Sequence, residues 1–133
     1  MRKICLSASI AALCIFLVAC GRGTGIVENA QIDTGASDRF TQEEIVFAMD
    51  AVKEHFRDSY DRWNELIALW YDEDWSDWKI DRSGLDKENT IILRSELYIG
   101  QGFGNDAQRT PLFWVLFWSN SSDSWVVNSW GKG

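Results

Sequence analysis

The feature that most constrains the fold is a change of hydrophobic period along the chain. From Thr41 onward, apolar residues recur every three or four positions between charged ones, as in a helix with one buried face. The run Thr41-Gln42-Glu43-Glu44 forms a capping box, in which Thr41 and Glu44 each satisfy a backbone N–H of the other. The apolar stripe that follows comprises Ile45, Ala48, Met49, Val52 and Phe56. A single stripe of this kind must be covered by another apolar surface.

Past this helix the period falls to two, which is typical of strands. We expect strands within residues 66–71 and 90–99, where apolar residues alternate with polar ones in the second segment. Residues 112–118 are aromatic and branched throughout, as in a strand buried on both faces, and the polar residues 119–124 turn the chain into a strand at 125–130. The pattern predicts an α+β fold, with one N-terminal helix packed on a curved four-stranded antiparallel sheet.

The amino-terminal residues have the composition of an export signal. Arg2 and Lys3 precede about 16 mostly apolar residues, fewer than the ~20 that a permanent membrane helix needs. The stretch ends in Leu17-Val18-Ala19-Cys20, which resembles the lipobox of bacterial lipoproteins, where the cysteine receives a diacylglyceryl group. We expect residues 1–19 to be a lipoprotein signal peptide and Cys20 to carry the lipid, which would anchor the protein at the extracytoplasmic face of the cell membrane. An ordinary secretory signal that ends near a cysteine is the alternative.

The expected processing has consequences for stability and charge. Cys5 and Cys14 lie in the removable segment, so the mature chain would hold no disulfide and would depend on its packed core. After removal of residues 1–19, 11 Lys and Arg would stand against 20 Asp and Glu, a charge of −9. This charge repels polyanions, which excludes nucleic acid as a partner. Residues 20–39 begin with Cys20 and are rich in Gly, Ser and Thr. This composition predicts a flexible tether that carries the lipid and precedes a folded domain at 40–133.

Several segments carry a resemblance to a known family over roughly residues 40–131. They are Leu69-Trp70-Tyr71-Asp72-Glu73, Ile91-Ile92-Leu93-Arg94-Ser95, the strand with Trp114, and Trp125-Val126-Val127-Asn128-Ser129-Trp130-Gly131. Together they are similar to small lipoproteins of Gram-positive bacteria, of unknown function and with a cystatin-like fold. The resemblance implies a cystatin-like domain and brings no active site with it. Residues 100–110 and the ending Lys132-Gly133 depart from the family's pattern.

The acidic segment 72–77 is the first candidate for chemistry. It fails the spacing of a calcium-binding EF-hand loop, since Asp77 stands where glycine is required and Ser83 where glutamate is required. We therefore expect a solvated loop, with no metal and no cofactor. A carboxylate near Asp72 paired with Glu96 would be the basis of the alternative function, a small glycan or cell-wall hydrolase.

The tryptophans are the second candidate. Strand alternation assigns three of them to one face of the core: Trp114, Trp118 and Trp125. Trp75 and Trp78 differ, because they stand among acids in an expected loop, and exposed tryptophan is enriched at binding sites. We expect Trp75, Trp78 and a loop at 100–110 to form the recognition edge of a non-enzymatic binding or interaction module. Its partner would be a protein or a small molecule.

Overall fold

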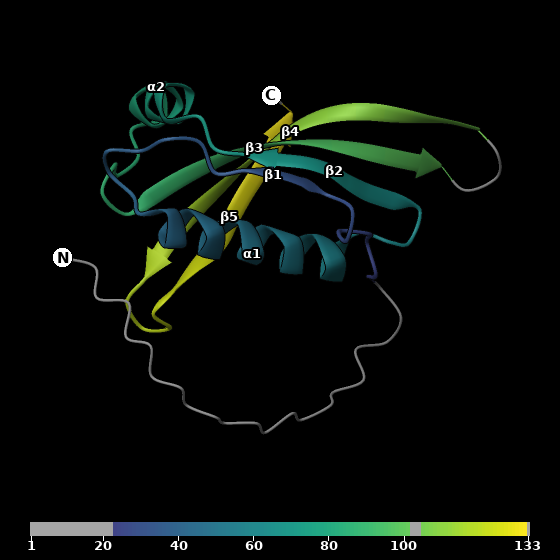
Figure 1. Cartoon of the computed structure of the whole chain (residues 1–133), viewed down its shortest axis with the longest axis horizontal. Coiled ribbons are helices and arrows are strands. Elements are labelled where there is room, and N and C mark those ends of the chain that lie inside the picture. The colour runs from purple at the N-terminus through teal and green to yellow at the C-terminus, as the bar shows by residue number, and fades with distance from the viewer. Residues whose placement is uncertain (1–22, 102–104, 133) are drawn as a thin grey trace.

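The computed structural model describes residues 23–101 and 105–132, so the expected signal peptide and Cys20 lie outside the described residues. The described chain is α+β, with two helices and a mixed sheet of five strands (Figure 1). In chain order the elements are β1 (Gln31–Asp33), α1 (Gln42–Ser59), β2 (Asn64–Trp70), α2 (Glu73–Ser83), β3 (Thr90–Gln101), β4 (Asn105–Ser119) and β5 (Ser124–Lys132). Within these ranges, neither helix combines the length and the hydropathy needed to cross a bilayer.

Helix α1 begins at the predicted capping box and packs across one face of the sheet (Figure 1). The hydroxyl of Thr41 accepts a hydrogen bond from the Glu44 N–H at 3.1 Å, and the Glu44 carboxylate accepts one from the Thr41 N–H at 3.1 Å. Every residue of the predicted stripe, from Ile45 to Phe56, is buried. The helix and its orientation toward the core are therefore confirmed.

The sheet has the strand order β1-β2-β3-β4-β5, with β5 and β1 at its edges. Strands β2 to β5 are antiparallel neighbours, and the β4–β5 hairpin is confirmed. Trp118 lies opposite Trp125 in this hairpin, with ring centres 5.4 Å apart in an edge-to-face contact. The sheet differs from the prediction by the short strand β1, which pairs in parallel with β2 and makes the sheet mixed.

Residues 23–39 differ from the expected flexible tether. The Thr24 N–H donates a hydrogen bond to the Arg57 carbonyl at the end of α1, and Ile26 forms a bridge with Glu65 of β2. Val27 is only 4% exposed and belongs to the main core. This segment therefore lies along the folded domain and contributes β1 to its sheet.

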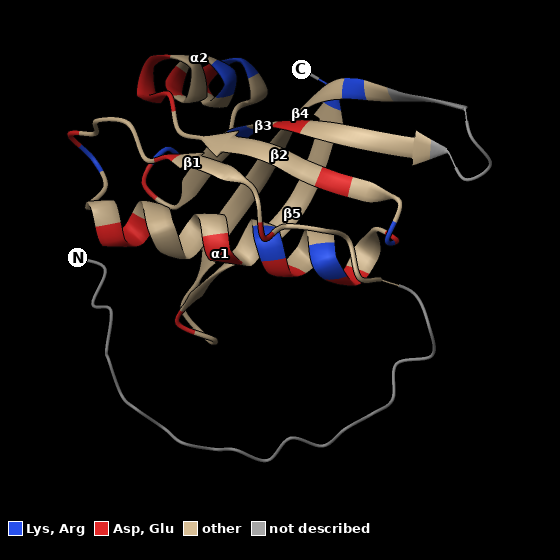
Figure 2. Ribbon diagram, turned by 45° about the vertical axis from the view of Figure 1, so that its right-hand side comes forward, with Lys and Arg blue, Asp and Glu red and all other residues tan. Residues whose placement is uncertain are grey.

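Residues 72–77 form the start of α2, so the expected acidic loop is wrong. The Asp72 carboxylate caps the helix by accepting a hydrogen bond from the Trp75 N–H at 3.3 Å, and Gly84 ends it in the left-handed conformation, with φ of 67°. Acidic residues in the first turn and Arg82 in the last complement the helix dipole (Figure 2). Ile80 anchors the helix to the sheet, in a small second core with Ile92 and Val115.

The expected loop at 100–110 also differs from the structure. Strand β3 continues to Gln101 and β4 resumes at Asn105, so most of this segment is a hairpin. The end of β3 and the beginning of β4 lie at the opposite end of the sheet from α2 (Figures 1 and 2). Trp75 and Trp78 therefore do not share one recognition edge with these described strand ends.

Candidate functional site

The two faces of the sheet are covered unequally. Helix α1 covers what we call the inner face, whereas α2 covers only one end of the opposite, outer face (Figure 1). Beyond α2, the strands align outer-face side chains in cross-strand rows. In register from β2 through β3 to β4, these rows are Trp70, Arg94 and Phe113; Ala68, Glu96 and Pro111; and Glu65, Tyr98 and Arg109.

The first row meets α2 and forms the centre of the candidate site. The Arg94 guanidinium carbon lies 4.7 Å from the ring centre of Trp75 and 5.5 Å from that of Trp70. Trp75 also lies 6.1 Å from the Phe113 ring, and a cavity of about 40 Å³ opens among these four side chains. Such a cavity has room for about one water molecule or the tip of one side chain.

Trp78 extends this cluster toward solvent. Its ring centre lies 6.4 Å from that of Trp75, and its side chain is 51% exposed. The Arg82 guanidinium stacks over it at 5.1 Å, and the Lys79 ammonium lies 4.5 Å from the Phe113 ring centre. We call the set Trp70, Trp75, Trp78, Arg82, Arg94 and Phe113 the aromatic–arginine surface. A guanidinium stacked on an aromatic ring keeps a fixed orientation, and its N–H groups can still donate hydrogen bonds in the plane of the group.

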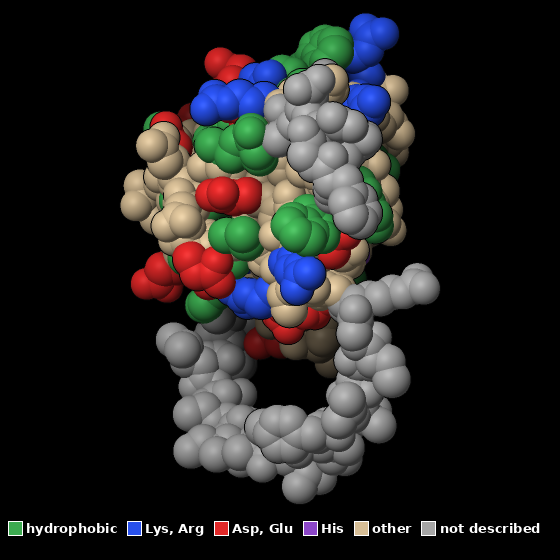
Figure 3. Space-filling model, turned by 90° about the vertical axis from the view of Figure 1, so that its right-hand side faces the viewer, with side chains coloured by type: hydrophobic (Ala, Val, Ile, Leu, Met, Phe, Trp, Pro, Cys, Tyr) green, Lys and Arg blue, Asp and Glu red, His purple; other side chains and the backbone are tan. Residues whose placement is uncertain are grey.

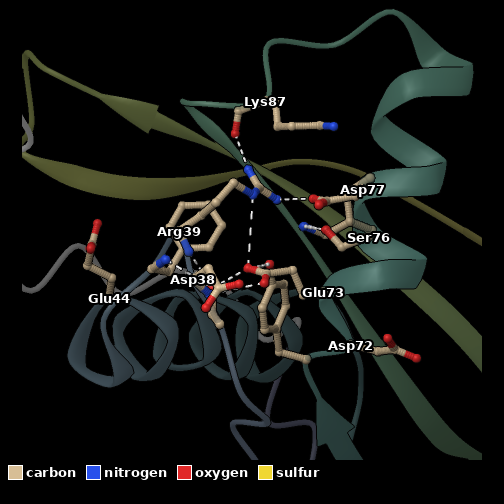
Figure 4. A network of polar contacts seen from close by, with 12 residues as sticks. Asp38, Arg39, Glu44, Asp72, Glu73, Ser76, Asp77 and Lys87 are labelled. Carbon is tan, nitrogen blue, oxygen red and sulfur yellow. Dashed lines mark hydrogen bonds and ion pairs between the residues drawn. The ribbon is translucent and has the colours of Figure 1, made fainter.

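An ionic network holds α2, and with it this surface, in place (Figure 4). Arg39, in the segment before α1, reaches across to α2. Its guanidinium donates hydrogen bonds to the Asp77 carboxylate and to the Lys87 carbonyl, and its Nε lies 4.0 Å from Glu73 Oε1. The side chain of Arg39 is 22% exposed and that of Glu73 is 18% exposed, so solvent screens the pair only in part.

Glu73 is the second centre of the network. Its carboxylate accepts hydrogen bonds from the Ser37 hydroxyl, from the Asp38 N–H at 3.0 Å and from the Tyr71 hydroxyl at 3.3 Å. Burial acts to raise the pKa of Glu73, but these hydrogen bonds outweigh it and lower the pKa below its ordinary value. Burial raises the pKa of Tyr71 to about 12, against the opposing charge of Arg39. All of these polar groups bond to one another, so we interpret the network as a structural one that fixes α2 to the segment before α1.

The two carboxylates named for the hydrolase alternative each have another partner in the structure. Asp72 caps α2, and Glu96 forms an ion pair with Arg109 at 3.5 Å. Over the described residues, no group of three or more His, Cys, Asp and Glu is arranged to hold a metal ion.

Of the expected site residues, Trp75 and Trp78 are neighbours on α2. Trp75 is half-buried between α2 and the sheet, Trp78 is exposed on α2, and Cys20 lies outside the described residues. Trp70, Arg94 and Phe113 were not predicted from the sequence as site residues. Alternation within each strand could have placed each of them on a face, but only the strand register puts them in one row.

Comparison with known proteins adds no relative. No protein-family model, no curated protein and no solved structure matches this chain.

Proposed function

We propose that the protein is a membrane-anchored extracytoplasmic lipoprotein whose folded domain is a non-enzymatic interaction module. It binds a partner protein through the aromatic–arginine surface. The observation that carries this proposal is Trp78, a tryptophan more than half exposed beside Trp75 and stacked under Arg82. Tryptophan and arginine are the residues most enriched among those that dominate binding energy at protein interfaces.

The arrangement of the cations supports a protein partner with carboxylates. Arg82 and Arg94 are stacked on rings, so little conformational entropy is lost when they bind. A guanidinium can donate two parallel hydrogen bonds to one carboxylate. The surface thus offers apolar rings for burial and fixed donors for acidic side chains, although the chain as a whole is acidic.

The anchor and the fold class complete the proposal. The lipobox at Cys20 supports lipidation, and the lipid would hold the domain at the extracytoplasmic face of the membrane. The packing of α1 on the antiparallel strands β2 to β5 supports the cystatin-like class that the sequence resembles. In that interpretation, β1 and α2 are additions to the cystatin-like core.

Photocrosslinking in intact bacterial cells tests the binding surface. A photoreactive amino acid replaces Trp78 in one strain and Phe47 in the control strain; Phe47 is 41% exposed but lies on α1. We expect a discrete crosslinked partner from position 78 only. With that partner purified, Trp78→Ala should weaken binding at least about 30-fold, the equivalent of 2 kcal/mol. Phe47→Ala should change the affinity less than about twofold. Equal crosslinking at both positions, or an unchanged affinity of Trp78→Ala, contradicts the proposal.

A further inference from the structure

The expected lipid anchor is attached close to one particular end of the folded domain. Cys20 precedes Gly23 by three positions, which span at most about 11 Å. The N–H groups of Thr24 and Gly25 both donate to the Arg57 carbonyl, the second at 3.2 Å. A lipid on Cys20 is therefore confined near the carboxyl end of α1, because the chain is bound to the domain immediately after it.

Close packing reinforces this attachment. A methyl group on Gly23, whose φ is 129°, would lie 2.7 Å from the Asp58 carbonyl oxygen, and one on Gly25 would lie 2.7 Å from the Phe56 ring. The chain thus runs directly against the last turn of α1. The bilayer that receives the lipid must lie beside this end of the domain.

The same end presents an exposed tryptophan. Trp63, in the loop between α1 and β2, is 53% exposed, more than any other large apolar side chain described. Its backbone is fixed, since its N–H donates to the Asp61 carboxylate at 3.0 Å and its carbonyl accepts from the Gly100 N–H at 3.0 Å. The Arg62 guanidinium stacks on its ring at 4.8 Å. Tryptophan is enriched at the headgroup level of membranes, where arginine can reach the phosphates.

The charges at this end do not favour electrostatic attraction to a bilayer, so contact through the Trp63 ring is the more favourable mode. Arg57 and Arg62 are offset by their neighbours Asp58 and Asp61. Figure 3 looks onto this end and shows hydrophobic side chains beside both basic and acidic ones. The overall negative charge also opposes adsorption to anionic lipid. Any membrane contact here must therefore rest on apolar burial.

We propose that the loop Tyr60–Trp63 docks on the bilayer surface through Trp63, and that the lipid on Cys20 and this loop together fix the orientation of the domain. The inference rests on the lipid anchor of the proposed function. Strand β2 begins beside the docked loop and carries the chain about 20 Å further to Trp70. The bilayer contact thus leaves α2 and the aromatic–arginine surface at the opposite end, open to a partner (Figure 1).

Spin-label accessibility on the lipidated protein tests this orientation. The full chain is produced in a bacterial host, the mass of its amino-terminal peptide is checked for diacylglyceryl, and the protein is placed in phosphatidylcholine vesicles. A nitroxide is attached at Ser59→Cys or, as the matched control, at Ser83→Cys. Both serines are exposed and each is the last residue of its helix, α1 and α2. We expect several-fold weaker collisions with a water-soluble nickel complex at position 59 than at position 83, unchanged from low to high salt.

The variant Trp63→Ser in the Ser59→Cys background completes the test. It should restore full access of the nickel complex to position 59. Equal access at positions 59 and 83 in lipidated protein overturns the docking and leaves the anchor standing. Protection that persists in Trp63→Ser overturns the role of Trp63. A chain without lipid on Cys20 overturns both the anchor and the docking.

Discussion

The inner and outer faces of the sheet differ in how much apolar surface they bury. The inner face packs α1 onto a large core that includes Phe56 and Trp114, both 0% exposed. The outer face has a core of only Ile80, Ile92 and Val115 with partly buried neighbours, and beyond it aromatic and arginine side chains reach solvent. Most of the buried core therefore lies on the inner face, and the proposed binding surface lies on the outer one.

The largest expected effect comes from comparing one tryptophan of each face. Trp114 is fully buried, and its indole N–H donates to the Ser95 hydroxyl at 2.7 Å. Trp114→Ala should lower the free energy of unfolding by about 3–5 kcal/mol, because it leaves a cavity and removes that hydrogen bond. Trp78→Ala should change it by less than about 0.5 kcal/mol. Urea denaturation of both variants measures the difference, and equal losses would contradict the division between the faces.

Tyr71 lies where the two faces meet and gives the next largest effect. Its ring belongs to the inner core, and its hydroxyl contacts Glu73 of α2. Burial raises its pKa from 10.0 to about 12, so between these pH values the unfolded chain loses a proton that the folded protein keeps. The free energy of unfolding should therefore be fully maintained below pH 10 and fall by about 3 kcal/mol as the pH rises to 12.

Urea denaturation across that pH range checks this expectation. Tyr71→Phe should remove most of the alkaline loss, since the group that titrates is gone. Burial also raises the pKa of Tyr60, so Tyr60→Phe should remove a further part of the loss. Tyr98→Phe is the control, because the Tyr98 side chain is 41% exposed. If Tyr71→Phe retained the full pH dependence, the loss would belong to another group.

The smallest expected effect concerns the attachment of α2. Arg39→Gln removes the ion pair between Arg39 and Asp77, in which the Arg39 side chain is 22% exposed and the Asp77 side chain 31% exposed. The cost in unfolding free energy should be about 1–2 kcal/mol, between the values of surface and buried pairs. Hydrogen exchange should show the loss of protection mainly in α2, with α1 little changed. Equal loss in both helices would show that the outer face is not a separate unit.

The elements that were predicted correctly are those whose sequence patterns lie within a short stretch of chain. The capping box at Thr41, the stripe from Ile45 to Phe56 and the β4–β5 hairpin each depend on residues close together in the chain. β1 was missed because Gln31–Asp33 has only three residues and pairs with β2 across the whole of α1. Helix α2 was missed although its signals were present, since Asp72 caps it and Gly84 follows it.

The candidate site was predictable only in part. The setting of Trp78 among acidic residues pointed to an exposed ring, and the structure confirms its exposure. The side chains around Trp75, which are Trp70, Arg94 and Phe113, come from three strands, with α2 inserted between the first two. Their meeting depends on strand register, which a single sequence with a bulge in β2 does not reveal.

Strand β5, at the edge of the sheet, has a consequence for the behaviour of the protein at high concentration. Its nine residues carry one charge, at Lys132, and Val126 and Trp130 are 47% and 44% exposed. A long apolar edge of this kind is a template for pairing with another molecule, and natural proteins often protect such edges with charges. Here the net negative charge of the whole chain supplies the protection, because copies with a pI of about 4.6 for the full sequence repel one another at neutral pH. Removal of residues 1–19 would take away Arg2 and Lys3 and lower the pI further, so self-association along β5 should begin as the pH falls toward that lower value.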